Sequence, residues 1–306
     1  MIFHYRAYGL DIEADLPLRA LCAHEGGADV RIVAGEVPDR LDTVEAETPR
    51  WTANASELLI DVPNVARFHI HDGCKIAYQP VSGASAEDVE AYLLGSCMGG
   101  ILHQRRLLVL HAAAICVGDR AFAICGKSGL GKSTTSAHLV EQGAALLSDD
   151  LAVFDSQGEF VQPGYAQTKL TTRAIEGLLE PGGEMRKLAG ERGKFAIARH
   201  QQFRAEPAPI AGLFVIERTK SAQPSLERVE PGLVAQYLRR HTYRKGYIVP
   251  GKEADHVRRC IDIAYRIPAW LALRPQSGDS TNFIVSAISE AIAATDFRVE
   301  TSNWVK

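Results

Sequence analysis

The sequence lacks any apolar run as long as a membrane-spanning helix requires. Its first residues, MIFHYRAYGLDIEADLPL, include acids and a histidine where a secretory signal peptide needs an uninterrupted apolar core. The cysteines form no C-x-x-C pair and no disulfide-framework spacing, and several lie within apolar runs, where a reduced cysteine packs as a small hydrophobe. These absences argue against a membrane or disulfide-stabilised protein and predict a reducing, cytoplasmic location.

An excess of charge of one sign is also missing. The formal net charge is −3, so the composition gives no general reason to expect nucleic-acid or membrane binding. No Cys/His ligand cluster is present, which disfavours a zinc enzyme. There is no internal repeat and no low-complexity linker. The 306 residues are 46% hydrophobic and 23% charged, which predicts a globular chain with two domains or one core and a large extension.

The most informative stretch present is Gly126–Ser133, which reads GKSGLGKS and matches the phosphate-loop pattern G-x-x-x-x-G-K-[ST]. The apolar run Ala121–Cys125 predicts a strand before the loop, and Ser133–Gln142 predicts a helix after it. The glycines let backbone N–H groups converge on phosphate oxygens, and the helix start adds its positive dipole end. The residues expected to bind nucleotide are Gly126, Lys127, Ser128, Gly129, Leu130, Gly131, Lys132, Ser133 and Thr134.

Two side chains of this loop have specific expected roles. Lys132 should reach the β- and γ-phosphates, and Ser133 should ligate Mg²⁺ through its hydroxyl. The pattern therefore predicts that the chain binds ATP, or another nucleoside triphosphate, together with Mg²⁺. The alternative is a glycine-rich turn with a surface lysine, which would need no strand before it and no helix after it.

A pair of carboxylates follows the next predicted strand. The run 144–147 predicts a buried strand, and the helix before it provides the crossover that a parallel strand requires. This strand ends at Asp149 and Asp150, which we expect at the C-terminal edge of the sheet, where ligands bind. Side chains alternate along a strand, but the backbone can turn at its end, so both can reach one site. One carboxylate could ligate Mg²⁺ and the other could accept a proton from an attacking hydroxyl; the alternative is a helix cap or a solvated turn.

The block 107–155 resembles the catalytic domain of HPr kinase/phosphorylase, a bacterial serine kinase whose core is similar to that of phosphoenolpyruvate carboxykinase. The resemblance rests on His111, the phosphate loop and the Asp pair, in the family's order and spacing. It implies that Asp150 is the general base for an acceptor serine and that Asp149 supports the metal or orients the base. It also implies that His111 is an active-site residue near the pair and that Lys132 handles the phosphates during transfer.

This resemblance implies an α/β fold, with a phosphate-loop core like that of HPr kinase and phosphoenolpyruvate carboxykinase over residues 85–306. The strand patterns of residues 1–84 predict a smaller β-rich N-terminal domain, which does not itself resemble the N-terminal domain of HPr kinase. The implied activity is transfer of the γ-phosphate of ATP to a serine of a peptide or protein, in a homo-oligomer. The HPr kinase-like enzymes of lasso-peptide biosynthesis are similar in carrying this compact core, so a precursor's C-terminal serine is one expected acceptor. Other possibilities are an HPr(Ser) kinase, a small-molecule kinase, and a nucleotide-binding regulator or assembly protein with little catalysis.

One departure from the family leaves a role open. The family carries a metal-contacting Glu in a Glu-x-Arg-Gly segment downstream of the Asp pair, whereas this chain reads PGYAQTKLTTRAIEGLLE there. Among the basic residues between 181 and 209, Lys194 is favoured as a phosphate or acceptor contact, because it lies at a turn into a short apolar strand.

Alternation and turn signals place the remaining elements. Strands are expected over 2–8, 30–33, 58–62, 66–71, 75–78, 107–111, 113–117 and 210–218. Helices are expected from 85 to about 101, over 171–179, 233–240 and 280–294. The helix from Ser85 is expected to pack on the sheet that begins at 107.

Overall fold

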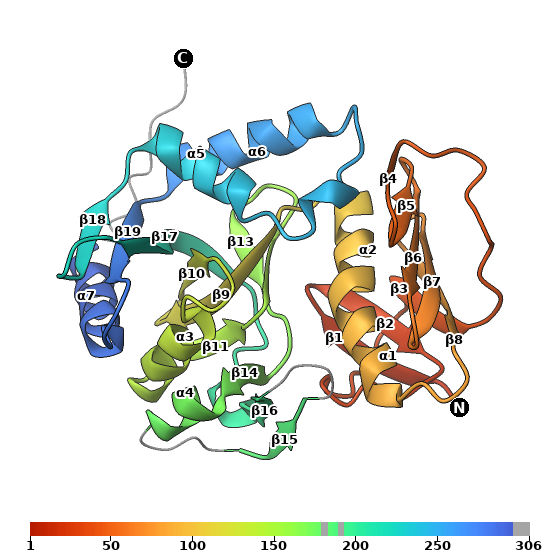
Figure 1. The fold of residues 1–306 in the computed structure, drawn as a ribbon, viewed down its shortest axis with the longest axis horizontal. Coiled ribbons are helices and arrows are strands. Elements are labelled where there is room, and N and C mark those ends of the chain that lie inside the picture. The colour runs from red at the N-terminus through yellow and green to blue at the C-terminus, as the bar shows by residue number, and fades with distance from the viewer. Residues whose placement is uncertain (179–182, 189–192, 296–306) are drawn as a thin grey trace.

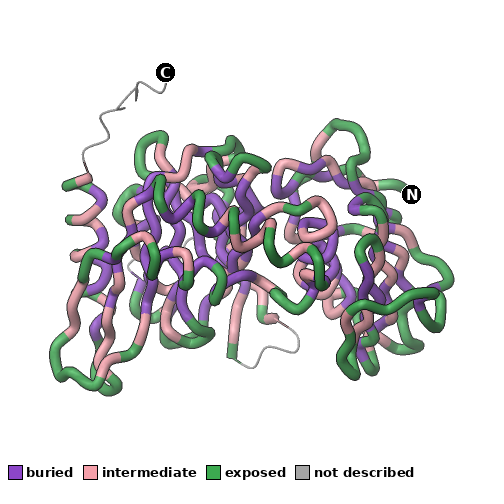
Figure 2. Tube along the Cα trace, turned by 90° about the horizontal axis from the view of Figure 1, so that it is seen from above, coloured by how far each residue is buried: buried purple, intermediate pink, exposed green. Residues whose placement is uncertain are grey.

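The computed structural model describes residues 1–178, 183–188 and 193–295, and it contains two large sheets with a helical segment between them (Figure 1). Buried positions follow the strands of both sheets (Figure 2). The prediction of an α/β protein is confirmed. Within these ranges no helix combines the length and the apolar character that crossing a membrane demands.

The first sheet has the strand order β1-β2-β3-β8-β7-β6-β5-β4. Its strands are β1 Phe3–Ala7, β2 Leu10–Ala14, β3 Val30–Ala34, β4 Ala46–Thr48, β5 Trp51–Ala53, β6 Glu57–Val62, β7 Ala66–His71 and β8 Lys75–Pro80. The hairpin between β7 and β8 turns at Asp72 and Gly73, both with positive φ, as Asp-Gly predicts. Strands β2, β4 and β5 were not predicted, because β4 and β5 are very short and β2 directly follows a tight turn.

A helical segment lies between the two sheets (Figure 1). It comprises α1 Ala86–Tyr92, a π-helical turn η1 Leu93–Cys97, and α2 Met98–Gln104. Its buried side chains belong to one hydrophobic cluster that includes residues of both sheets, so it packs on the first sheet as well as on the predicted one. The predicted domain boundary at residue 84 falls just before α1 and stays a prediction.

The second sheet has the order β10-β9-β12-β13-β17-β19-β18, with β11 also paired to β9 and β10 to β17. Its strands are β9 Val109–Val117, β10 Arg120–Gly126, β11 Ala145–Ser148, β12 Leu151–Phe154, β13 Phe160–Gln162, β17 Ala208–Thr219, β18 Ser225–Arg228 and β19 Ala269–Pro275. The strands predicted over 107–111 and 113–117 are one continuous strand, β9. Its central position explains this, since it pairs with β10 on one side and with β11 and β12 on the other.

Helices cover both faces of this sheet. Successive residues of β10 alternate between the two hydrophobic clusters on these faces, as the period of a strand requires. One cluster includes α3 Lys132–Glu141 and α7 Thr281–Ala294, and the other includes α5 Pro231–Arg240 and α6 Glu253–Arg266. Short 3-10 turns occur at η2 His200–Gln202 and η3 Lys245–Tyr247.

The strand after α3 is not placed quite as predicted. β11 runs in the direction of β10, because both are antiparallel to β9, but β9 lies between them. β12 continues β11 along the same strand: Ala145 lies opposite Cys116, and Leu151 lies opposite His111. Asp149 and Asp150 therefore occupy a break between two collinear strands and not a free strand end. The break still provides the backbone turn that allows both side chains to reach one site.

A small sheet, with strand order β14-β16-β15, lies below the second sheet in Figure 1. Its strands are β14 Gln167–Thr171, β15 Met185–Lys187 and β16 Lys194–Ala198, and α4 Thr172–Glu176 follows β14. Of these three strands the sequence predicted only β16, as the short apolar strand that follows Lys194. The predicted helix over 171–179 is shorter in the structure, and its last residue lies outside the described residues.

The decrease in folding stability at acid pH should depend on His241, which follows α5. Its side chain is 6% exposed, and burial, reinforced by nearby cations such as Lys132, lowers its pKa to about 4. The pKa is 6.5 without this environment, so the unfolded chain binds the proton first and stability falls as pH falls from about 6.5 to 4. The free energy of unfolding, measured with urea from pH 6.5 to 4, should therefore decrease less in His241→Leu than in the wild type, by up to about 3 kcal/mol. His4→Leu, at an exposed position of β1, is the control. An equal loss of stability at acid pH in His241→Leu and in the wild type would contradict the prediction.

Candidate active site

The phosphate loop connects β10 to α3, as the motif requires. Gly129 and Gly131 have φ values of +81° and +94°, a conformation that residues with a side chain rarely adopt. At Gly126 a Cβ would lie 2.8 Å from the carbonyl oxygen of Ile216 on the neighbouring strand. The glycines are therefore needed for the path of the loop. No side chain caps the start of α3, which suits an end that receives phosphate.

Lys132 is folded into the loop that precedes it. Its Nζ donates a 2.9 Å hydrogen bond to the carbonyl oxygen of Gly126, and the residue is only 7% exposed. Burial lowers the pKa of Lys132. A neutral carbonyl is a weaker partner for an ammonium group than a phosphate oxygen, so a bound polyphosphate would draw Lys132 toward itself.

Asp149 is the buried member of the Asp pair. Its Oδ2 accepts a 2.7 Å hydrogen bond from the backbone N–H of Lys169 on β14. Burial raises the pKa of Asp149 to about 6, and the neighbouring Asp150 charge acts in the same direction. Its Oδ1 is buried and has no hydrogen-bond partner within the described part of the chain.

Asp150 lies beside a histidine and a lysine. Its Oδ1 lies 3.2 Å from His111 Nδ1, and its Oδ2 lies 3.4 Å from Lys169 Nζ. Burial alone would raise its pKa, but these two neighbours hold the pKa of Asp150 well below its usual range. The carboxylate is therefore ionised at neutral pH. Tyr243 lies against the His111 ring, with a centroid separation of 6.1 Å.

One cleft of about 430 Å³ connects the loop to the Asp pair. The predicted site residues that line it are His111, Ser128, Gly129, Gly131, Lys132, Ser133, Thr134, Asp149 and Asp150. Gly126, Lys127 and Leu130 belong to the loop but do not line this cleft. Lys194, the favoured basic residue, lines it as well.

Sequence reasoning missed several lining residues: Lys169, Leu170, Thr171 and Tyr243. Lys169 contacts both carboxylates, Asp149 through its backbone and Asp150 through its side chain. No motif identifies it, because QTKLT has too few apolar residues to stand out as a strand. The pairing of β14 with β16, which is distant in sequence, positions it.

The residues at this site fit a divalent cation. The partnerless Asp149 Oδ1 and the Ser133 hydroxyl are oxygen donors, the type that Mg²⁺ prefers. Ser133 also interacts with the Asp149 carboxylate and partly offsets the effect of burial on its pKa. Among the described residues that line the cleft, the acids are Asp149 and Asp150, and β14 contributes Lys169.

Arg274, near the end of β19, holds the loop from outside the motif. Its Nη1 donates a 2.8 Å hydrogen bond to the carbonyl oxygen of Leu130. Its Nε and Nη2 donate to the hydroxyls of Ser280 and Thr281, at the start of α7, each at 3.0 Å. Arg274 thus ties the phosphate loop to α7.

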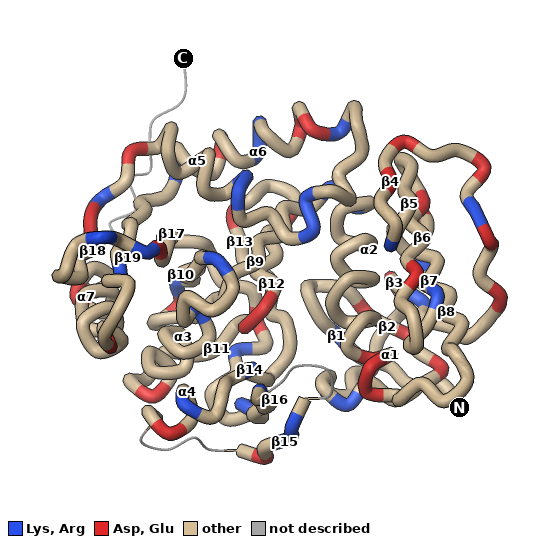
Figure 3. The backbone as a smooth tube through the Cα atoms, viewed as in Figure 1, with Lys and Arg blue, Asp and Glu red and all other residues tan. Residues whose placement is uncertain are grey.

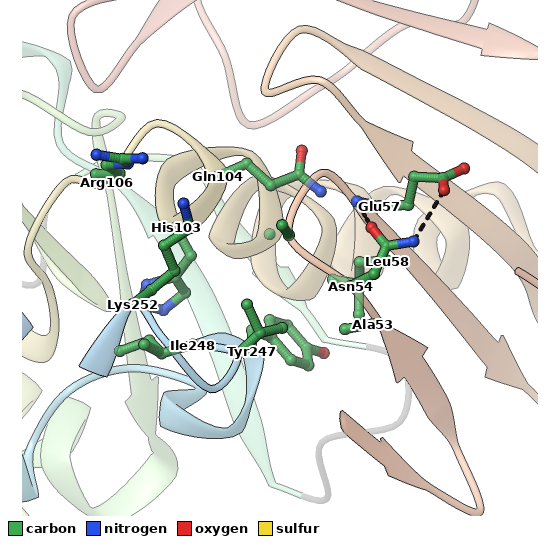
Figure 4. Close-up of a pocket in the computed structure, with 13 residues that line it drawn as sticks. Ala53, Asn54, Glu57, Leu58, His103, Gln104, Arg106, Tyr247, Ile248 and Lys252 are labelled. Carbon is green, nitrogen blue, oxygen red and sulfur yellow. Dashed lines mark hydrogen bonds between the residues drawn. The ribbon is translucent and has the colours of Figure 1, made fainter. Parts of the chain in front are cut away.

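A separate cavity of about 120 Å³ lies where the first sheet meets α2 and the segment after α5 (Figure 4). Asn54 and Glu57 lie at one side of it, and His103, Arg106 and Lys252 lie at another. None of the residues predicted from the sequence to form the active site lines this cavity.

Comparisons with known proteins add little to this geometry. No protein-family model matches the chain, and no curated protein matches it. Among solved structures, the chain is similar to an Hpr(Ser) kinase/phosphatase from Coxiella burnetii, with 12% identity, 60% of this chain and 96% of that chain covered, and a TM-score of 0.30. A likeness of this degree carries no argument, so the inferences below rest on the site itself.

Loss of the Arg274 clamp should loosen the phosphate loop. We expect Arg274→Met to weaken binding of a fluorescent ATP analogue about tenfold, because the loop amides lose a fixed position for the phosphates. Arg218→Met is the matched control, because Arg218 binds the carbonyl oxygens of Pro275 and Gln276 and not the loop. Equal affinities for the two variants would show that the clamp is not needed.

Proposed function

We propose that this protein is an ATP-dependent kinase that transfers the γ-phosphate to a serine hydroxyl of a peptide or protein. One observation carries the proposal: the phosphate loop, the Asp pair and Lys169 open onto the same cleft. A loop alone supports nucleotide binding. A carboxylate beside it, held ionised by two neighbours, is what transfer to a hydroxyl additionally needs.

In this proposal the loop positions the triphosphate. The glycine-rich backbone and the start of α3 face the phosphates, and Lys132 exchanges the Gly126 carbonyl for phosphate oxygens. Ser133 and Asp149 would hold Mg²⁺, which when bound would offset phosphate charge. Asp149 is fixed for this task by the N–H of Lys169.

Asp150 then orients the acceptor hydroxyl and receives its proton. A carboxylate with a lowered pKa is a weak base, but phosphoryl transfer passes through a loose transition state in which the hydroxyl needs positioning more than early deprotonation. Lys169 Nζ lies 3.4 Å from the same carboxylate. From there it is placed to contact the transferring phosphoryl group, where it would stabilise developing negative charge.

The finer assignments belong to this proposal. They are an HPr kinase-like core spanning 85–306 with an N-terminal domain over 1–84, a cytoplasmic homo-oligomer, and an acceptor such as the C-terminal serine of a lasso-peptide precursor or the serine of HPr. The resemblance of the motif block 107–155 to HPr kinase supports the core, the oligomer and the acceptor, the strand patterns of residues 1–84 support the N-terminal domain, and the cysteine pattern supports the location.

The proposal is tested by Asp150→Asn. We expect transfer from radiolabelled ATP to serine peptides, HPr or lasso-peptide precursors to fall about 100-fold or more, with ATP affinity retained. Asp119→Asn, in the exposed hairpin turn before β10, is the control. Undiminished transfer by Asp150→Asn would remove its role as base. Nucleotide binding by the wild type without transfer to any of these acceptors would favour a nucleotide-binding regulator.

Lys169 should affect the rate more than nucleotide binding. We expect Lys169→Met to lower kcat about 100-fold with little change in ATP affinity, because its ammonium group acts on the transferring phosphoryl group. Lys169→Arg should recover part of the rate. Lys75→Met, which removes an exposed charge from β8 of the first sheet, serves as control. A Lys169→Met variant with a wild-type kcat would contradict the assignment.

A further inference from the structure

The small sheet presents one face toward the active-site cleft, and part of its other face packs against α3 and α4. Antiparallel pairing places Lys169 of β14 opposite Ala196 of β16, and Ala196 opposite Arg186 of β15. Residues directly opposite each other share a face, so these side chains form one row across the sheet. The residues that alternate with them along the strands, such as Leu170 and Ile197, pack in a hydrophobic cluster on the other face.

The face that carries this row is hollowed beyond the active site. A groove of about 220 Å³ is lined by Ala196 and Ala198, together with Arg186 and, from the N-terminal part of the chain, Arg19. Because the side chains of the two alanines are small, they leave room for the groove. Lys169, at one end of the row, lines the active-site cleft, and Arg186, at the other end, lines the groove. In Figure 3 basic positions follow β14, β16 and β15.

The far end of the groove has spare capacity for a carboxylate. Arg186 and Arg19 both approach the same Glu87 oxygen, at 3.5 and 3.7 Å. The side chain of Arg19 is 65% exposed. Within the described part of the chain, one shared carboxylate oxygen occupies few of the N–H donors of the two guanidinium groups, although Glu184 also lines the groove and the buried Glu90 interacts electrostatically with both arginines.

We propose that this groove binds the acceptor chain in extended form, with its serine at Asp150 and an acidic side chain held by Arg186 and Arg19. The inference rests on the proposed kinase function and specifies its substrate. Lys169 and Arg186 are two strand spacings apart, which is about 10 Å. An extended chain advances about 3.3 Å per residue, so the acidic residue lies about three positions from the serine.

The test uses the full chain, radiolabelled ATP and an array of serine peptides with one aspartate at each position up to about five residues from the serine. We expect phosphorylation to be strongest with the acid about three positions away, on one side of the serine. For that peptide, Arg186→Glu should raise KM about tenfold and leave kcat and ATP affinity unchanged. Lys187→Glu is the matched control, because this exposed neighbour points to the opposite face of the same strand.

The possible outcomes distinguish a failure of the groove proposal from a failure of the kinase proposal on which it rests. If the wild-type protein binds no ATP, or binds ATP but transfers its γ-phosphate to no acceptor, both the kinase proposal and the groove proposal are wrong. Serine phosphorylation with no preference for an acid, or with equal KM values for Arg186→Glu and Lys187→Glu, would overturn the groove alone. Arg19→Glu gives a second reading from a different element and should raise the same KM.

Discussion

The contact on which the site most depends is the pair of interactions that Lys169 makes with Asp149 and Asp150. The two acids lie in a break between β11 and β12, where the backbone no longer fixes their side chains in alternation. The N–H of Lys169 holds one carboxylate and its ammonium group approaches the other. β14 is thereby attached to the strand break, and the cleft gains a wall opposite the phosphate loop.

This arrangement gives two adjacent carboxylates different chemistry. Burial dominates at Asp149 and raises its pKa to about 6, whereas His111 and Lys169 outweigh burial at Asp150 and lower its pKa. Different environments therefore separate a proposed metal ligand from a proposed proton acceptor, although the residues are neighbours in the chain. The π-helical segment between the sheets contributes indirectly, because Arg244 donates to Ser96 there and the adjacent Tyr243 lies against His111.

Local features of the fold and site were predictable from sequence, and features made by distant pairing were not. The phosphate loop, its flanking strand and helix, and the Asp pair are contiguous and have strong patterns. That the loop and the Asp pair line one cleft followed from the expectation that the strands before them, β10 and β11, run in the same direction and end at the same edge of the sheet. This holds although β9 lies between the two strands. Lys169 and Arg274 could not be recognised, because β14 is a weak pattern stabilised by β16, and Arg274 lies 144 residues from the carbonyl it binds. The sequence of the helical segment also does not show that it packs between two sheets, because its apolar spacing is the same as that of a helix that packs on one sheet.

The central claim is that the loop and the Asp pair act on one nucleotide. The most direct measurement is a crystal structure with Mg²⁺ and a non-hydrolysable ATP analogue. The account predicts the β- and γ-phosphates at Lys132 and the loop amides, Mg²⁺ on Ser133 and Asp149, and the γ-phosphate facing Asp150. An analogue bound in the cavity between the first sheet and α2, or a γ-phosphate directed away from Asp150, would contradict it.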